Sequence, residues 1–101
     1  MARYGMSDGT VVDTANASAS YEESTRFDGR NHISLATGTQ WDHETLYRSR
    51  KGRYYVEHMS QWQGTTPRAE WVSNEAAVRW LLTNEHEIPA DLKPLVDSVT
   101  E

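Results

Sequence analysis

The sequence TLYRSRKGRYYVEHM, residues 45–59, decides the fold because it is typical of two β-strands joined by a tight turn. The runs 45–49 and 53–59 are rich in the aromatic and β-branched residues that strands favour. The loop Arg50-Lys51-Gly52 has glycine at its third position, which suits a type I turn closed by a left-handed bulge residue. This stretch therefore predicts an antiparallel hairpin.

The register of that hairpin follows from its loop, which pairs Leu46 with Val56 and Tyr47 with Tyr55. Successive side chains of a strand point to opposite faces, so the hairpin has two different faces. One face carries Glu44, Leu46, Arg48, Tyr54, Val56 and His58, and the other carries His43, Thr45, Tyr47, Tyr55, Glu57 and Met59. Both faces mix apolar with charged residues, so the sequence leaves open which one packs inward.

The chain after the hairpin predicts a third strand and two helices. The run 68–72 returns as a strand. Ser73 is a good helix N-cap, and the apolar stripe behind it predicts a helix over residues 74–84. Pro89 forbids continuation of that helix and opens a second, short one from residue 89.

The expected core joins one face of the hairpin to the longer helix. Its members are either Leu46 and Val56 or Tyr47 and Tyr55, together with Trp71, Val78, Leu81 and Leu82. The fold class is then α+β, a small antiparallel β-meander of three to five strands packed against one C-terminal helix, with a short final helix.

Residues 1–40 are weakly patterned apart from two Asp-Gly pairs. Asp8-Gly9 and Asp28-Gly29 each stand between short β-type runs, which is a strong local signal for a hairpin. The segment 14–24 between them is rich in Ala and Ser and is interpreted as a loop or a single helical turn. Two small N-terminal hairpins are therefore expected.

Length and composition limit the class of protein. The 101 residues suffice for one domain, 1–101, and carry 10 Lys and Arg against 15 Asp and Glu, a formal charge of −5. Cysteine is absent, which excludes disulfides, thiol nucleophiles and zinc–thiolate sites. Mean hydropathy is −0.78, no apolar run could span a bilayer, and the first residues lack the apolar region of a signal peptide. We expect a cytoplasmic protein without a membrane segment.

Several segments carry a resemblance to known proteins. The runs LYRSRKGRYY (46–55), SQWQG (60–64), AEWVS (69–73) and AVRWLL (77–82) resemble a set of uncharacterised small bacterial and phage proteins. That resemblance implies the order strand, turn, strand, loop, strand, helix, and it implies no activity. Small acidic phage proteins also include inhibitors of host defence such as anti-CRISPRs, an analogy of size and charge alone.

The histidines are the candidates for a catalytic or metal site. His43 is flanked by Asp42 and Glu44, and the predicted register places Glu44 opposite His58, as in an acid–base pair. A charge pair on a hairpin explains the same residues without chemistry and is favoured, because no recognisable nucleophile or oxyanion hole accompanies them. No spacing matches a known metal-ligand motif, so neither a metal nor a cofactor is expected.

The hairpin turn suggests nucleic-acid binding as one function. Arg48, Arg50, Lys51 and Arg53 bring four positive charges close together, with tyrosines between them. A basic, aromatic β-ribbon can hold phosphates and stack on bases. The alternative is a solvated turn whose long cationic side chains cover tyrosine rings.

Protein binding is the function that we favour, with nucleic-acid binding second and catalysis by His43, Glu44 and His58 third. Trp62 stands in a polar loop, QWQGTT, and Trp, Tyr and Arg dominate interface hot spots. The expected partner contacts are the charges of Arg48, Arg50, Lys51 and Arg53 with the anchors Tyr55 and Trp62. Trp62 could instead fold back into the core, and the exposed aromatic residues could serve a homodimer. A phage or mobile-element inhibitor would fit this description.

Overall fold

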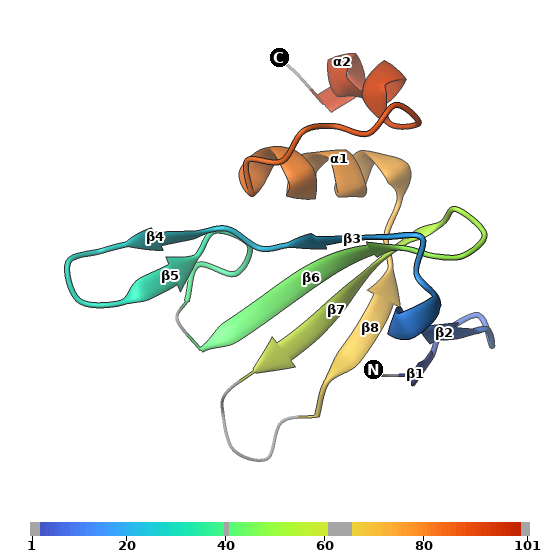
Figure 1. Ribbon diagram of the computed structural model, residues 1–101, viewed down its shortest axis with the longest axis horizontal. Helices are drawn as coiled ribbons and strands as arrows, with labels where there is room; N and C mark the ends of the chain where they lie inside the picture. The colour runs from blue at the N-terminus through green and yellow to red at the C-terminus, as the bar shows by residue number, and fades with distance from the viewer. Residues whose placement is uncertain (1–2, 40, 61–65, 100–101) are drawn as a thin grey trace.

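The structure is a computed structural model that describes residues 3–39, 41–60 and 66–99, and the predicted hairpin lies at its centre (Figure 1). Strands β6 (Asp42–Arg48) and β7 (Tyr54–Ser60) pair antiparallel, with Leu46 opposite Val56 and Tyr47 opposite Tyr55, which confirms the predicted register. Gly52 closes the turn with a φ of 93°, in the left-handed region that favours glycine. The loop chemistry therefore set the pairing of the two longest strands.

The central sheet has four strands in the order β3-β6-β7-β8, all antiparallel. Strand β8 (Arg68–Trp71) matches the predicted third strand and completes the meander. Strand β3 (Ala19–Glu22) follows a short 3-10 helix, η1 (Thr14–Asn16), and pairs with β6. The prediction of a loop or helical turn over residues 14–24 was wrong for β3, because this edge strand of small and polar residues forms by pairing with β6 rather than by local propensity.

Two further hairpins confirm the predictions at the Asp-Gly pairs. Strands β1 (Arg3–Gly5) and β2 (Val11–Asp13) form one, and strands β4 (Thr25–Phe27) and β5 (His32–Ser34) form the other. In each turn the Asp side chain accepts hydrogen bonds from backbone N–H groups two or three residues later. This local bonding is the reason that a short sequence signal was sufficient.

Helix α1 (Asn74–Thr83) confirms the predicted helix, and the Ser73 hydroxyl accepts its capping bond from the Ala76 N–H at 3.1 Å. The second helix begins later than the predicted residue 89, as a 3-10 turn η2 (Lys93–Leu95) that continues into α2 (Val96–Val99). The late start of this helix has a local cause. The Pro89 carbonyl accepts bonds from the Leu92 and Lys93 N–H groups, so the chain makes a turn before the helix starts.

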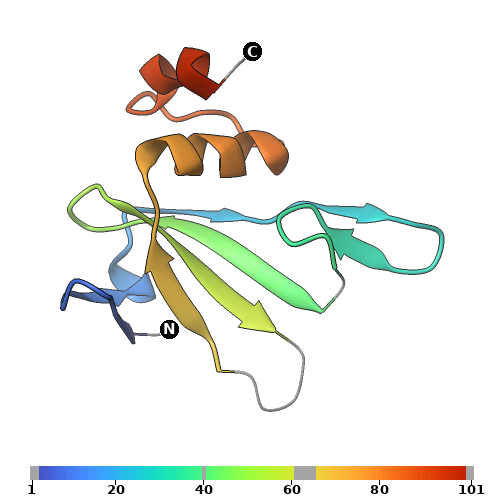
Figure 2. The ribbon, with the colours of Figure 1, turned by 180° about the vertical axis from the view of Figure 1, so that it is seen from behind.

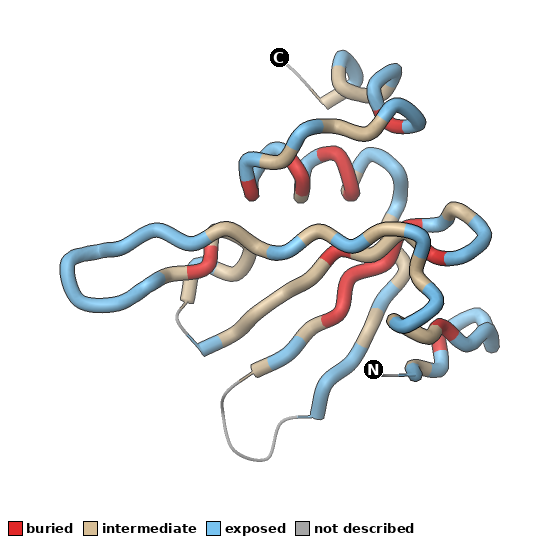
Figure 3. The backbone as a smooth tube through the Cα atoms, viewed as in Figure 1, coloured by how far each residue is buried: buried red, intermediate tan, exposed pale blue. Residues whose placement is uncertain are grey.

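Both faces of the central sheet are covered (Figures 1 and 3). The sequence left open which face of the hairpin packs inward, and in the structure both do. The face that carries Leu46 and Val56 packs against α1 and the C-terminal segment. Its buried members are Leu46, Tyr54, Val56, Ala77, Val78, Leu81 and Leu92. The opposite face packs against the β1–β2 hairpin, where the buried members are Met6, Val12 and Tyr55. The two alternative cores are therefore both present.

Of the expected core residues, Trp71 packs on the second cluster rather than beneath α1, and Leu82 lies outside the core. Trp71 lies on the face of Tyr55, with the two rings edge to face at 5.7 Å, because alternation along β8 turns it away from α1. Leu82 is 45 % exposed, whereas its neighbour Leu81 is fully buried. The apolar stripe of α1 was wider than the face that the sheet covers, so one of two adjacent leucines remains in solvent.

The end of α1 contains a strained residue. Glu85 has a φ of 63°, and it is the sole non-glycine residue with a positive φ in residues 3–39, 41–60 and 66–99. The His86 N–H bonds the Leu81 carbonyl and the Glu85 N–H bonds the Leu82 carbonyl, at 2.9 and 3.2 Å. This is the pattern of a Schellman motif, whose left-handed position favours glycine.

Replacing Glu85 with glycine is expected to raise the free energy of unfolding by about 1 kcal/mol, because the substitution relieves the left-handed strain. Urea denaturation at low micromolar protein would measure the change. The matched control is Glu87→Gly, whose backbone has no positive φ and whose substitution should not stabilise. Equal effects of the two substitutions would contradict the assignment of strain to Glu85.

Candidate functional site

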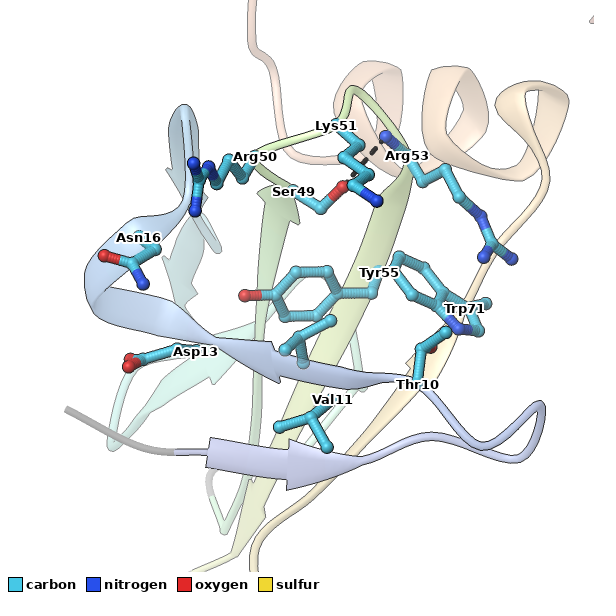
Figure 4. Close-up of a pocket in the computed structure, with 11 residues that line it drawn as sticks. Thr10, Val11, Asp13, Asn16, Ser49, Arg50, Lys51, Arg53, Tyr55 and Trp71 are labelled. Carbon is cyan, nitrogen blue, oxygen red and sulfur yellow. Dashed lines mark hydrogen bonds between the residues drawn. The ribbon is translucent and has the colours of Figure 1, made fainter.

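Four of the predicted contact residues, Arg50, Lys51, Arg53 and Tyr55, line a cavity of about 440 Å³ beside the β6–β7 turn, and Arg48 does not (Figure 4). The turn, with Arg50, Lys51 and Arg53, forms one side of it. Strand β2 and η1 form the other side, and the rings of Tyr55 and Trp71 lie between the two. The Arg53 N–H donates to the Ser49 hydroxyl at 3.0 Å, which fixes the shape of the turn.

Two of the four predicted cations already have partners. Arg48 forms an ion pair with Asp91, with 3.4 Å between Nε and Oδ2. Arg53 forms one with Asp8 at 3.0 Å, and its guanidinium lies 3.8 Å from the centre of the Trp71 ring. Hydrogen bonds from Thr10, and then from Arg53, hold the pKa of Asp8 well below its usual range. Both arginines are therefore engaged in contacts within the fold, and of the two Arg53 lines the cavity.

The other two cations, Arg50 and Lys51, are exposed at the turn. In the part of the chain that the structure describes, neither side chain forms an ion pair or a hydrogen bond. Val11 lines the same cavity and is 68 % exposed. We define the tip surface as Arg50, Lys51 and Val11, two unpaired positive charges and an apolar side chain around one cavity.

Val11 was not predicted as a contact residue. Alternation in the run TVVD, residues 10–13, contained the signal, since burial of Val12 under the sheet turns Val11 outward. The alternation identifies Val11 as a contact residue only when the packing of the β1–β2 hairpin on Tyr55 is also known. The sequence did not reveal that packing.

Tyr55 is not an exposed anchor, so that part of the predicted contact set is corrected. Its exposed fraction is 0 %, and its ring stacks on Tyr47 with 5.2 Å between ring centres. The cause is the β1–β2 hairpin, which covers this face of the sheet. Trp62 lies outside the described residues, so its predicted role stays a prediction.

The Tyr55 hydroxyl differs from that of its neighbour Tyr54. The buried Tyr55 hydroxyl has no hydrogen-bond partner among the described residues, and burial raises its pKa to about 12. The Tyr54 hydroxyl donates to the Asp91 carboxylate at 3.0 Å, and burial followed by this bond raises its pKa well above the usual range. Both phenols therefore stay protonated at neutral pH.

The histidine cluster forms two separate pairs. Glu44 lies opposite His58 as predicted, with 3.0 Å between Oε2 and Nδ1. His43 does not join them, because its Nδ1 pairs with Glu23 at 3.0 Å. Burial lowers the pKa of His58, while the Glu44 carboxylate acts in the opposite direction.

These pairs connect elements of the fold. Glu44 also accepts a hydrogen bond from the Trp80 indole at 3.0 Å, which ties β6 to α1. Glu23 accepts from the Glu44 N–H at 2.9 Å, which ties the segment after β3 to β6. A shallow cavity of about 590 Å³ lies beside His43, Glu44 and His58. Across residues 3–39, 41–60 and 66–99, no three acidic or histidine side chains gather as a metal-ligand set.

Comparison of the chain with protein-family models, curated proteins and solved structures gives no match. Within the described residues, no helix has the length and apolar character needed to cross a bilayer. The tip surface and the histidine pairs are therefore the features from which we infer function.

Proposed function

We propose that this chain is a non-enzymatic protein-interaction module that binds its partner through the tip surface. The observation that carries the proposal is the combination of two unpaired cations with an exposed valine at the edge of one cavity. Arginine is enriched at protein interfaces and among their hot spots. Arg50, Lys51 and Val11 are the proposed contacts, with Trp62 as a further predicted one.

The chemistry of this surface indicates an acidic segment with an apolar side chain as the partner. Its carboxylates would pair with Arg50 and Lys51, and its apolar group would contact Val11 and the cavity. The chain has a formal charge of −5, so its net charge disfavours the approach of an acidic segment. Attraction confined to one place gives orientation to the encounter.

Nucleic-acid binding is the second candidate, and the ion pairs weaken it. Arg48 and Arg53 are engaged with Asp91 and Asp8, which leaves two free cations at the turn instead of four. Two neutralised phosphates would give a slope of log affinity against log salt of only about −1.4 to −1.8. Specific nucleic-acid binders make many more phosphate contacts.

The phage or mobile-element setting and the cytoplasmic location stay predictions, and so does the absence of an enzymatic role.

Reversing both charges, Arg50→Glu with Lys51→Glu, should reduce capture of the partner from a host lysate by more than tenfold, since two attractive contacts become repulsive. The matched control is Arg79→Glu with Lys93→Glu, which makes the same change in net charge at exposed positions that do not line the cavity. Capture is compared with and without nuclease. Equal capture by both variants would exclude the tip surface, and a partner lost on nuclease treatment would favour nucleic acid.

A further inference from the structure

The β4–β5 hairpin extends from the body at the end opposite the β6–β7 turn, as both views show (Figures 1 and 2). All of residues 25–32 are exposed. The hairpin is nevertheless well formed, because Asp28 accepts bonds from the Arg30 and Asn31 N–H groups and Phe27 packs edge to face on His32 at 5.2 Å. We call residues 25–32 the arm.

The arm carries one exposed aromatic side chain and two cations, together with the carboxylate of Asp28 in its turn. Phe27 is 60 % exposed. The guanidinium groups of Arg26 and Arg30 form no ion pair or hydrogen bond with any described residue. The tip surface combines unpaired cations with an exposed apolar side chain in the same way, and such a combination fits a surface that is apolar and acidic.

Such a surface lies at the end of α1, beside the root of the arm. Leu82 is 45 % exposed, and Glu85 and Glu87 are exposed just after it, without an ion pair or hydrogen bond from their carboxylates to a described residue. The Glu85 N–H bonds the Leu82 carbonyl at 3.2 Å, so the two residues are neighbours along the backbone at the end of α1. Glu85 also occupies a backbone conformation that favours glycine, and strain of this kind is often retained for function.

The arm and this acidic patch, Leu82, Glu85 and Glu87, are held at the same end of the molecule. The Ser24 N–H donates to the Asn84 side-chain oxygen at 3.0 Å, and the Ser24 hydroxyl donates to the Asn84 carbonyl. Ser24 immediately precedes the arm, and Asn84 is the C-cap of α1. The two bonds fix the root of the arm next to the patch.

We infer that the occupant of the acidic patch is the arm of a second copy of this chain. Phe27 of one copy packs on Leu82 of the other, and Arg26 and Arg30 pair with Glu85 and Glu87. Because arm and patch lie at the same end, a twofold axis between the copies forms both contacts at once, as in an isologous dimer. The tip surface lies at the opposite end and stays accessible in this dimer.

Sedimentation of the full chain at low salt, from low micromolar to about 0.5 mM, tests the inference. The mean mass should rise with concentration toward twice the 11.5 kDa of one chain. A mass of one chain throughout this range would overturn the proposal. Arg50→Glu with Lys51→Glu should leave the dimer intact, so failure of the proposed function and failure of dimerisation are distinguishable.

Charge-swapped variants supply the sharper test. Arg26→Glu with Arg30→Glu should be monomeric, and so should Glu85→Lys with Glu87→Lys, because each places like charges in contact. An equimolar mixture should form a heterodimer, since the acidic arm of the first variant then meets the basic patch of the second and the reverse contact also forms. Thermal melting confirms that each variant is folded. Variants that dimerise alone as the wild type does, or a mixture that stays monomeric, would contradict the arm-to-patch contact.

Discussion

Leu81→Ala is expected to lower the free energy of unfolding by about 3–4 kcal/mol, whereas Leu82→Ala is expected to lower it by less than about 0.5 kcal/mol. Leu81 is fully buried in the cluster between α1 and the sheet, so its truncation removes transfer energy and leaves a cavity. Leu82 is 45 % exposed, so its truncation to alanine removes little buried apolar surface. The same substitution at adjacent positions thus gives very different results.

Urea denaturation at low micromolar protein measures both values under conditions that suppress association. Because a small domain has only about 5–15 kcal/mol of stability, the Leu81 variant should unfold at a visibly lower urea concentration. Helix propensity is unchanged between the two variants, so it cancels in the comparison. Losses of equal size would mean that α1 does not present Leu81 to the sheet as described.

The protein is expected to unfold in alkali, with stability falling steeply above pH 10. The cause is the burial of Tyr54 and Tyr55, whose exposed fractions are 1 % and 0 %. Burial raises the pKa of Tyr55 from 10.0 to about 12, and that of Tyr54 further. The unfolded chain therefore releases these protons first, and stability that is fully present below pH 10 is lost as pH rises through the folded values.

Each of these tyrosines should contribute a slope of about 1.4 kcal/mol per pH unit over this window. Tyr55→Phe removes its own contribution and should lower the slope between pH 10 and pH 12 by about 1.4 kcal/mol per pH unit, while Tyr4 and Tyr47, whose pKa values are also raised, keep theirs. At neutral pH this variant should be within about 1 kcal/mol of the wild type, since its hydroxyl has no partner among the described residues. Tyr54→Phe should be less stable than Tyr55→Phe, because it loses the bond to Asp91. Unfolding curves that do not change between pH 10 and 12 would contradict the burial of both phenols.

The elements that the sequence predicted well are those with local causes. The turn Arg50-Lys51-Gly52 set the register of β6 and β7, and the Asp-Gly turns produced both small hairpins. Ser73 capped α1 where expected. Strand β3 was missed because its pairing partner, β6, is distant in the sequence. The two-sided sheet was missed for a related reason, since both faces mix apolar and charged residues and the covering elements come from opposite ends of the chain.

In the candidate site too, the features with local causes were predicted and those that depend on distant segments were not. The sequence located the cationic turn, yet the partners of Arg48 and Arg53 are Asp91 and Asp8, separated from them by 43 and 45 residues. Local pattern could not tell which cations stay free. Tyr55 was assigned to the surface although the β1–β2 hairpin buries it. The opposition of Glu44 and His58 was predictable because it depends on the register alone.

The most direct test of the proposed function is an NMR titration of the labelled full chain with two probes. The first is the acidic peptide acetyl-EEFEE-amide, with acetyl-KKFKK-amide as its matched control, and the second is a single-stranded oligothymidylate. We expect the acidic peptide to shift the backbone amides of Arg50, Lys51 and Val11, with no such shifts from the basic peptide or the oligonucleotide. Shifts at these amides from the oligonucleotide, or none from the acidic peptide, would contradict an acidic protein segment as the partner of the tip surface.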